Sequence, residues 1–571
     1  MPAMTATAPA STRAASNGAA ASPASTPPLP GFTGARRVPQ AINEPIKSYA
    51  PGSPERTELK ARLASMSGER PDIPAIIGGE EIRAGAKHQV TMPHAHQHVL
   101  ADWHLGGAAQ ATQAIERALA ARAEWADWSW EDRAAVFLRA ADLLCGPWRA
   151  TLNAATMLGQ SKNVFQAEID AACEMADFFR YNAMFAQQIY EEQPVAGAGA
   201  WNTMDYRGLE GFVYAVSPFN FTAIGGNLPT SAALMGNVVL WKPSNAAMLS
   251  SYYTMRLLEA AGLPPGVINF VPGDPVEISK VALAHRELAG VHFTGSTTVF
   301  NSMWETIGRN MGSYKSYPRI VGETGGKDFI LAHPSADAQV VAVAAVRGAY
   351  EYQGQKCSAA SRLYVPRSLW PKVKESMVAM IADIKMGDTR DFRNFMGAVI
   401  DKRAHDRISG YLADAKANAT IIAGGVADAS TGWFVQPTLV EAKTPEYRLM
   451  CEEIFGPLLT VYVYDDAKWH ETLAVIDRTS PYALTGAVIS QDRGALGEAT
   501  HALRNAAGNF YLNDKCTGAV VGQQPFGGAR ASGTNDKAGS KWNLMRWASP
   551  RTIKETFVPP TQYTYPHMAA E

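Results

Sequence analysis

The sequence is poor in cysteine, and its five cysteines include no CxxC pair. Cys145, Cys173, Cys357, Cys451 and Cys516 form an odd set, which argues against a disulfide framework and against a structural zinc site. This pattern favours a reducing compartment. The chain also lacks an apolar run of about 18 residues, the length that a membrane-spanning helix requires. We therefore expect a soluble protein with no membrane span.

An excess of charge of either sign is also missing. Lysine and arginine number 52 against 53 aspartates and glutamates, so the net charge is −1. Bulk charge therefore gives no reason to expect binding to nucleic acid or to an anionic membrane. The chain has 571 residues, 47% of them hydrophobic, which is enough for a large core divided into two or three domains.

The N-terminal segment lacks acidic side chains, since none precedes Glu44, and residues 1–35 are rich in Ala, Ser, Thr and Pro. A segment of this composition cannot bury enough apolar surface to order itself. The composition is typical of an organellar transit peptide, although arginine is sparse before Arg36. We expect residues 1–35 to be disordered and to direct the chain to the mitochondrial matrix. A plain tail on a cytoplasmic protein is the alternative.

Helical and strand-like segments follow one another in a regular order. Three-to-four spacing of apolar residues predicts helices at Ala108–Ala123, Arg133–Leu144 and Glu168–Ile189. Short apolar strands then alternate with helices about every 25 residues, which predicts βαβ units and a doubly wound parallel sheet. The predicted strands are Gly211–Val216, Val238–Trp241, Val267–Val271 and Gly290–Phe293, and the helices are Ala223–Met235, Ala246–Ala260, Val276–His285 and Thr298–Arg309. A second α/β series begins near Phe329 and includes Asp337–Tyr352, Leu363–Val365, Pro371–Met386 and Gly508–Leu512.

A thiol and a carboxylate stand in glycine-rich strings near the junction of the two series. Cys357 lies in Glu351-Tyr-Gln-Gly-Gln-Lys-Cys357-Ser-Ala, and Glu323 lies in Gly322-Glu323-Thr-Gly-Gly-Lys. A thiolate attacks carbonyl carbon well at neutral pH, and a carboxylate can act as a base for the thiol or for water. The pair indicates covalent catalysis through a thioester. The structural interpretations are a buried core cysteine and a solvated turn glutamate.

Other polar groups follow the ends of the predicted strands, where α/β sheets bind ligands. Ser217, Asn220 and Phe221 follow the strand Gly211–Val216, and Lys242 ends the next strand. Gly295-Ser296 ends the fourth strand and opens a helix, whose backbone N–H groups would favour a pyrophosphate. There is no GxGxxG string, so the shared position of these groups, and not any one of them, indicates a dinucleotide site.

The order and spacing of Asn220, Lys242, Gly295-Ser296, Glu323, Cys357 and Glu453-Ile-Phe455-Gly-Pro resemble the aldehyde dehydrogenase superfamily from about residue 40 to the C-terminus. The string around Cys357 and the string Gly522-Gln-Gln-Pro-Phe-Gly-Gly-Ala-Arg-Ala-Ser-Gly-Thr-Asn-Asp are similar to the Δ1-pyrroline-5-carboxylate dehydrogenase branch, also called L-glutamate γ-semialdehyde dehydrogenase. The resemblance implies NAD-dependent oxidation of glutamate γ-semialdehyde to glutamate, the second step of proline catabolism. The sequence shows no flavin-binding proline oxidase portion, so we expect any proline dehydrogenase to be a separate chain.

The resemblance also implies roles for individual residues. Cys357 would be the nucleophile, Glu323 the general base, and the Asn220 amide an oxyanion donor together with the Cys357 N–H. The residues implied for the cofactor are Lys242, Gly295, Ser296, Thr297, Thr298, Val299, Glu453 and Phe455. The residues implied for the substrate are Ser217, Phe221, Ser358, Gly518, Ala519 and Phe526. The backbone N–H groups of Gly518 and Ala519 would take the α-carboxylate, and the two phenylalanines would enclose the aliphatic stem.

The expected fold is a doubly wound parallel-sheet cofactor domain, an α/β catalytic domain and a small β oligomerisation flap. The NAD-binding domain would comprise residues 36–192 and 212–327, and the catalytic domain residues 328–525. The flap would comprise residues 193–211 and 526–571, including the strand-like Trp201–Tyr206. Because exposed strand edges need a partner, we expect a homodimer at least.

Several alternatives stay open at this point. Succinic semialdehyde is the main rival substrate, and Asn245 carries no charge that would decide between NAD and NADP. A thiol hydrolase or amidase without redox chemistry would leave Lys242 unexplained, and a non-catalytic protein would leave the retained thiol and base unexplained. We interpret His94-Ala-His96-Gln-His98 as a polar strand face and not as a metal site. Apart from Cys357, no cysteine is assigned chemistry.

Overall fold

The computed structural model describes residue 34 and residues 36–571, so the predicted transit segment lies outside the described residues. The chain divides into a unit of residues 1–37 and a unit of residues 38–571. Gly34, Arg36 and Arg37 are the described residues of the first unit, and all three are exposed. Within the described residues, no helix combines the length and apolarity that crossing a bilayer requires.

The first large sheet has seven strands in the order β11-β10-β7-β8-β9-β2-β3. Its first five strands are parallel, as the strand–helix alternation predicted. These strands are β7 (Phe212–Val216), β8 (Val238–Lys242), β9 (Ile268–Phe270), β10 (Leu288–Thr294) and β11 (Arg319–Glu323). Their almost wholly buried Val, Leu, Ile and Phe side chains explain why both faces must be covered by helices. The intervening helices are α7 (Thr222–Leu234), α8 (Met248–Ala260), α9 (Pro275–Ala284) and α10 (Thr297–Arg309).

The strand order places a topological switch point between β7 and β10. The chain runs outward from β7 through β8 to β9, then returns to the other side of β7 to form β10 and β11. Right-handed crossovers therefore put α7 and α8 on one face of the sheet and α9 and α10 on the other. The N-terminal helices add to this domain: α1 (Pro54–Glu69), α2 (Ala108–Asp127), α3 (Trp130–Cys145), α4 (Arg149–Gln160), α5 (Val164–Ala167) and α6 (Met175–Glu191).

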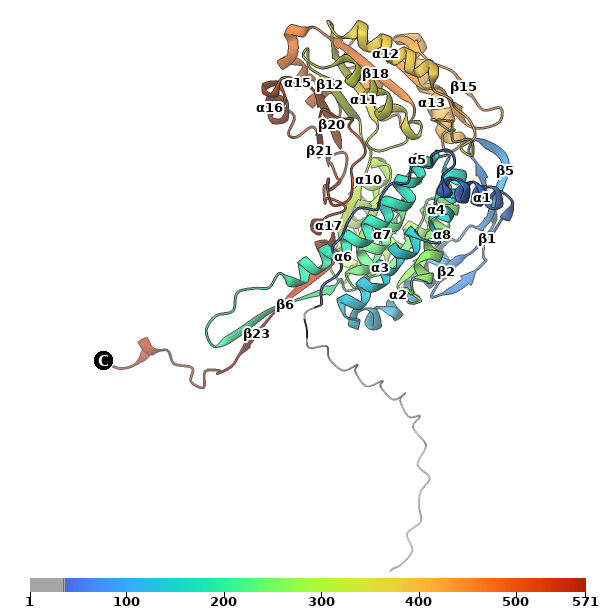
Figure 1. The fold of residues 1–571 in the computed structure, drawn as a ribbon. Helices are drawn as coiled ribbons and strands as arrows, with labels where there is room; N and C mark the ends of the chain where they lie inside the picture. The colour runs from blue at the N-terminus through green and yellow to red at the C-terminus, as the bar shows by residue number, and fades with distance from the viewer. Residues whose placement is uncertain (1–33, 35) are drawn as a thin grey trace, which may run out of the picture. The chain divides into compact units, whose positions relative to one another are not determined.

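The second large sheet also has seven strands, in the order β14-β17-β18-β13-β12-β20-β21, and only the β14–β17 pair is antiparallel. It is formed by β12 (Asp328–Ala332), β13 (Ala360–Pro366), β14 (Thr420–Ala423), β17 (Thr438–Glu441), β18 (Leu458–Tyr464), β20 (Thr485–Ile489) and β21 (Asn509–Leu512). Its helices are α11 (Ala338–Tyr350), α12 (Trp370–Asp383), α13 (Lys402–Asn418), α14 (Arg448–Cys451), α15 (Trp469–Thr479) and α16 (Arg493–Ala502). The last helix, α17 (Lys541–Met545), packs instead against α6. Figure 1 shows α11 and α12 beside β12 and β18. The α/β fold class is as predicted.

Two smaller features complete the chain. Strands β6 (Ala200–Gly208) and β23 (Ala548–Thr556) pair antiparallel over nine residues as a two-stranded sheet of their own (Figure 1). Strands β1 (Asp72–Ile73), β4 (Lys87–Met92) and β5 (Ala95–His104) form a three-stranded sheet, and β2 (Ala75–Ile77) and β3 (Glu80–Ile82) extend the first large sheet. The remaining short strands are β15 (Ala427–Asp428), β16 (Phe434–Val435), β19 (Tyr482–Ala483) and β22 (Ala529–Arg530).

The structure corrects two local predictions. The helix predicted at Glu168–Ile189 begins with a π-helical segment, η1 (Glu168–Glu174), before α6. The prediction that His94, His96 and His98 share one strand face is wrong. His94 precedes β5, where the β4–β5 register shifts, and its Nδ1 lies 3.3 Å from Ser161 Oγ. Among the described residues, no group of three or more His, Cys, Asp or Glu side chains could hold a metal ion.

Candidate active site

The predicted nucleophile and base both lie where the two large sheets meet. Glu323 is the last residue of β11, and Cys357 lies between the short helix η4 (Glu351–Gly354) and β13. Tyr352 and Gln353 have positive φ angles of 50° and 56°, so the chain bends sharply just before the cysteine. This bend lets α11 end and β13 begin with the thiol held between them.

Cys357 is a buried thiol in an acidic environment. Its side chain is 9% exposed. Burial raises the pKa of the thiol well above its ordinary value, and the nearby Glu323 carboxylate raises it further. The thiol is therefore protonated at rest and needs a base, or a bound cation, to become the thiolate nucleophile.

Glu323 has the properties of a general base. Burial raises its pKa to about 8, with Asp536 raising and Lys537 lowering it. Its Oε2 atom is buried and has no hydrogen-bond partner among the described residues. A buried carboxyl oxygen without a partner has a desolvation cost, so such a group is a candidate for contact with water or substrate.

The glycines after the base allow the two strands' ends to approach. A side chain at Gly326 would place its Cβ 2.1 Å from the Cys357 carbonyl oxygen. A side chain at Gly325 would place its Cβ 1.9 Å from a carboxylate oxygen of Glu453. The Gly326 N–H instead donates to Glu453 Oε1 at 2.9 Å. Gly326 therefore requires glycine because a Cβ there would meet backbone, whereas a Cβ at Gly325 would displace the carboxylate of Glu453.

The amide of Asn220 is fixed close to the nucleophile's segment. Its side chain is 3% exposed, and Nδ2 donates to the carbonyl of Gln355, two residues before Cys357, at 3.0 Å. A carboxamide nitrogen has two hydrogens, so one remains available as a second donor. The predicted oxyanion role requires a donor held in this manner, and it stays a prediction.

The predicted cofactor residues are distributed around the switch point. Lys242 ends β8, and its Nζ donates to Asn245 Oδ1 at 3.1 Å. Burial lowers the pKa of this lysine to about 8. On the β10 side, Ser296 caps α10 by accepting a hydrogen bond from the Val299 N–H at 3.4 Å. Gly295, Thr297 and Thr298 complete this strand-to-helix turn.

Phe455, predicted to lie near the nicotinamide, adopts an uncommon backbone conformation. Its φ angle is 56°, in the left-handed region that a bulky residue rarely occupies. Its ring contacts Phe219 edge-on, with ring centroids 5.8 Å apart. Because Phe219 directly precedes Asn220, this contact connects the Glu453–Phe455 segment to the oxyanion candidate.

The predicted substrate residues fall into two groups. Ser358 shares a 2.7 Å hydrogen bond with Thr517, which brings the residue after the nucleophile against the Gly518–Ala519 loop. Gly518 has a φ of 101°, which only glycine adopts readily. Phe526 is half-buried in an isolated β-bridge with Ala538. The Ser358–Thr517 hydrogen bond therefore places the Gly518 loop beside the Cys357 segment, whereas the substrate role of Phe526 stays a prediction.

The second group lies after β7. Ser217 Oγ accepts a hydrogen bond from Trp241 Nε1 at 3.0 Å, a contact that is structural by itself. The Phe221 ring lies 4.1 Å from Lys162 Nζ. The predicted enclosure of a substrate by Phe221 and Phe526 therefore stays a prediction.

Sequence reasoning missed two buried charged groups beside the site. Lys162 is fully buried, forms a 2.6 Å ion pair with Asp170, and lies over the Tyr352 ring as well as that of Phe221. Glu174, at the end of η1, has its pKa raised to about 8 by burial and by Asp170, and its charge also acts on Cys357. Neither stands in a recognisable string. Lys162 lies in the polar string Gln160-Ser161-Lys162-Asn163, which gives no signal of its burial.

The other cysteines occupy ordinary structural positions. Cys173 and Cys516 are buried, and Cys145 and Cys451 are half-buried. Cys516 donates to the carbonyl of Ser358 at 3.5 Å, which helps to hold the loop before Gly518.

Comparison with known proteins places this geometry in a family. Residues 82–553 match the aldehyde dehydrogenase family. This chain belongs to the aldehyde dehydrogenase family. The recognition made from the sequence strings is therefore confirmed.

Three relatives show how specific the match is. The aldehyde dehydrogenase described here is 53% identical over 536 residues to "Delta-1-pyrroline-5-carboxylate dehydrogenase, mitochondrial" of Dictyostelium discoideum, covering 93% of this chain and 96% of that protein. It is 54% identical to the Δ-pyrroline-5-carboxylate dehydrogenase from Mycobacterium tuberculosis, solved with bound NAD, with a TM-score of 0.91 and coverage of 94% and 100%. A 1-pyrroline-5-carboxylate dehydrogenase from Thermus with bound NAD is 32% identical, with a TM-score of 0.85 and coverage of 91% and 100%.

Proposed function

We propose that this aldehyde dehydrogenase oxidises L-glutamate γ-semialdehyde, the open form of Δ1-pyrroline-5-carboxylate, to L-glutamate with NAD⁺ as in proline catabolism. The observation that carries the proposal is the buried junction of Cys357 and Glu323 beside the Ser358–Thr517 contact and the Gly518 loop. The relatives' names agree with it. The function expected from the sequence is the one that these observations support.

The residues present can perform each protein-side step. Cys357 Sγ, as the thiolate, bonds to the aldehyde carbon, and the carbonyl oxygen becomes an oxyanion. The free N–H of Asn220 and the Cys357 N–H can donate to it, and each such donor is worth about 3–4 kcal/mol in comparable sites. After the aldehyde hydrogen leaves as hydride, the carbon is a thioester. Glu323 then takes a proton from water, which attacks the thioester and releases the carboxylate and the thiol.

The donor set fits a nicotinamide dinucleotide. NAD⁺, when bound, supplies the hydride acceptor. The buried Lys242 ammonium has no carboxylate within ion-pair distance among the described contacts, so it can serve ribose hydroxyls. Glu453 offers a carboxylate for the other ribose, and the α10 turn offers backbone N–H groups for phosphate. NAD is the proposed cofactor, because the two solved relatives named above hold it.

We also propose a division of labour along the chain. Residues 36–192 and 212–327 would bind NAD, residues 328–525 would carry the nucleophile, and residues 193–211 and 526–571 would form the oligomerisation flap of a homodimer. The separate two-stranded sheet of β6 and β23 supports the flap. A proline dehydrogenase acting as a separate chain would supply the substrate. For location we propose the mitochondrial matrix, because the Dictyostelium discoideum relative is named mitochondrial. The bacterial relative favours the alternative, a cytoplasmic enzyme.

Initial rates of NADH formation across a panel of aldehydes test the proposal. Glutamate γ-semialdehyde should give the highest kcat/KM, ahead of succinic semialdehyde and propanal, and Cys357→Ala should give no NADH. A preference for succinic semialdehyde would contradict the assigned substrate. Thioester or amide hydrolysis without any NAD⁺ binding by calorimetry would instead identify a thiol hydrolase.

A further inference from the structure

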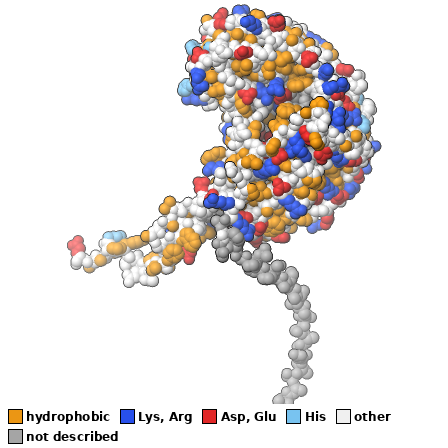
Figure 2. All heavy atoms as spheres, in the orientation of Figure 1, with side chains coloured by type: hydrophobic (Ala, Val, Ile, Leu, Met, Phe, Trp, Pro, Cys, Tyr) orange, Lys and Arg blue, Asp and Glu red, His pale blue; other side chains and the backbone are white. Residues whose placement is uncertain are grey.

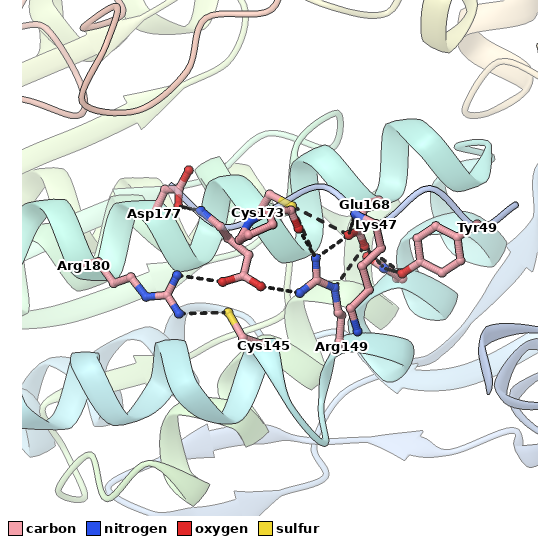
Figure 3. A network of polar contacts seen from close by, with 11 residues as sticks. Lys47, Tyr49, Cys145, Arg149, Glu168, Cys173, Asp177 and Arg180 are labelled. Atoms are coloured by element: carbon pink, nitrogen blue, oxygen red, sulfur yellow. Dashed lines mark hydrogen bonds and ion pairs between the residues drawn. The ribbon is translucent and has the colours of Figure 1, made fainter. Parts of the chain in front are cut away.

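The segment before the first helix is bound firmly to the N-terminal helices although it has no helix or strand of its own. We call residues 38–50 the strap. Glu44 accepts a hydrogen bond from Arg149 at 2.6 Å, and the fully buried Glu168 accepts one from Tyr49 at 2.8 Å (Figure 3). Charge-assisted bonds of this kind are about twice as strong as neutral ones, so the path of the strap is well defined.

Asn43, at the centre of the strap, connects it to a second segment far away in the sequence. Its Nδ2 donates to Asp177 Oδ2 and to the carbonyl of Val521, both at 2.8 Å. Its Oδ1 accepts from the Tyr181 hydroxyl at 3.2 Å and from Gln523 Nε2 at 2.9 Å. A carboxamide has two N–H donors and two lone pairs, so these four bonds use its whole capacity.

The segment that Asn43 contacts is a closed turn directly after the Gly518–Ala519 loop. The carbonyl of Val520 accepts hydrogen bonds from the N–H groups of Gln523 and Gln524, both at 3.0 Å. A Cβ at Gly522, where φ is +81°, would lie 2.2 Å from the Tyr181 ring, so the turn packs directly on α6. The turn therefore moves as one body, and its position relative to α6 is set by this packing and by Asn43.

From this arrangement we infer that Asn43 is a positioning residue for the substrate's α-carboxylate. Val521 lies two residues after Ala519, so fixing its carbonyl fixes where the N–H groups of Gly518 and Ala519 point. The inference rests on the proposed function, which assigns those N–H groups to the carboxylate. The strap thus makes part of the substrate site although no strap residue touches the substrate.

The variant Asn43→Ala tests this role. We expect KM for glutamate γ-semialdehyde to rise about tenfold, which corresponds to about 1.4 kcal/mol, while kcat and KM for NAD⁺ change less than about twofold. Binding of the product glutamate, measured by calorimetry, should weaken by the same factor. Propanal has no α-carboxylate, so its kcat/KM should not change. A general loss of folding would instead lower the apparent kcat for both aldehydes and leave the KM values unchanged.

Two further variants keep the test decisive. Tyr49→Phe removes a strap bond of similar length far from the turn and should leave every kinetic constant unchanged. Gln523→Ala removes one of the Asn43 contacts from an exposed side chain, so it should fold normally and raise the same KM by a smaller factor. If Asn43→Ala does not fold, Gln523→Ala alone decides the question.

The outcomes separate the two proposals. An active wild-type enzyme whose KM for the semialdehyde is unchanged in Asn43→Ala and Gln523→Ala would overturn the positioning role alone. Equal losses with propanal and with the semialdehyde would overturn it as well. A wild-type enzyme that does not turn over the semialdehyde would overturn the proposed function, and the positioning role with it.

Discussion

At the scale of single residues, the activity depends on two acids whose protons are held more tightly than usual. Burial disfavours the charged forms of Cys357 and Glu323, and the Glu323 carboxylate further disfavours the Cys357 thiolate. The site therefore starts neutral and becomes charged only when a donor or cation compensates. This explains why donors such as Asn220 are placed beside the nucleophile's segment.

The pH dependence of thioester hydrolysis follows from the pKa of Glu323. Its pKa is raised to about 8, so the carboxylate, the form that accepts a proton from water, is lost as pH falls below this value. We expect kcat to rise with pH through about 8 when hydrolysis limits turnover. Glu323→Gln should abolish this rise of kcat with pH. It should also give a single-turnover burst of NADH in stopped flow, followed by slow turnover. Unchanged steady-state turnover in Glu323→Gln would refute the base assignment.

A neighbouring residue offers a matched control for this assignment. Asp536 raises the pKa of Glu323. Asp536→Asn keeps the size of the side chain and removes its charge, so the rise of kcat with pH should move to lower pH without disappearing. If the rise of kcat moves to higher pH in Asp536→Asn, or stays where it is in the wild type, the titrating group is not Glu323.

The residues of the candidate site divide into those that form strings and those that act alone. Cys357, Glu323 and Gly518 stand in long strings, so a sequence suffices to name them. Lys162 and Asn43 have partners at 2.6 Å to 2.9 Å that come from other segments. Their neighbours in sequence give no sign of these contacts, which only the fold creates. Polar contacts between segments distant in sequence are therefore the part of a site that a sequence conceals.

At the scale of elements, the N-terminus of α7 is held by an unusual buried pair. Asp170, on the π-helical segment η1, accepts hydrogen bonds from the N–H groups of Thr222 and Ala223 at 2.9 Å and 2.8 Å. The same carboxylate pairs with Lys162, and both side chains are fully buried. A carboxylate at a helix N-terminus is favourable, and here it also places Asn220 and Phe221, which directly precede the helix.

Breaking this pair should be costly. Lys162→Met leaves a buried carboxylate without its cation, and we expect the free energy of unfolding to fall by about 3–5 kcal/mol in urea denaturation. Lys402→Met provides the control, because Lys402 and Asp406 also lie 2.6 Å apart but are exposed. It should cost less than about 1 kcal/mol. Equal effects of the two variants would contradict the importance of burial.

The elements predicted well are those with strong periodicity. The alternating strands and helices of the first sheet were placed within a few residues, because both faces of each strand are apolar and each helix has one buried face. Strands β2 and β3 were missed because they are only three residues long, and η1 because its extra backbone residue leaves no mark on side-chain spacing. Register shifts such as that at Thr91 cannot be read from alternation alone, which is why the histidines were misplaced.

At the scale of the whole molecule, the two-stranded β6–β23 sheet presents apolar surface. Trp201 and Phe557 are each 58% exposed and Ile553 is 41% exposed. Figure 2 shows hydrophobic side chains on this two-stranded sheet. This sheet has two unpaired outer edges in the described chain, and a two-stranded sheet is marginally stable alone. A second copy of the chain is the partner that we propose.

Light scattering tests this assembly. The wild-type chain should have at least twice the monomer mass at micromolar concentration, and the double variant Trp201→Asp/Ile553→Asp should be monomeric because it places charge on the apolar surface. Val276→Asp changes a side chain that is 70% exposed on α9 and should not alter the mass. A monomeric wild-type chain would contradict the dimer.

The glycine pair at 325–326 has a consequence for inherited variation. A side chain at Gly325 would collide with the Glu453 carboxylate, and a side chain at Gly326 would collide with the carbonyl oxygen of Cys357. Every missense change at Gly326, alanine included, should therefore inactivate the enzyme, and changes at Gly325 should weaken it by displacing Glu453. In a mutational scan, these two adjacent positions should tolerate far fewer substitutions than exposed surface positions of the same chain.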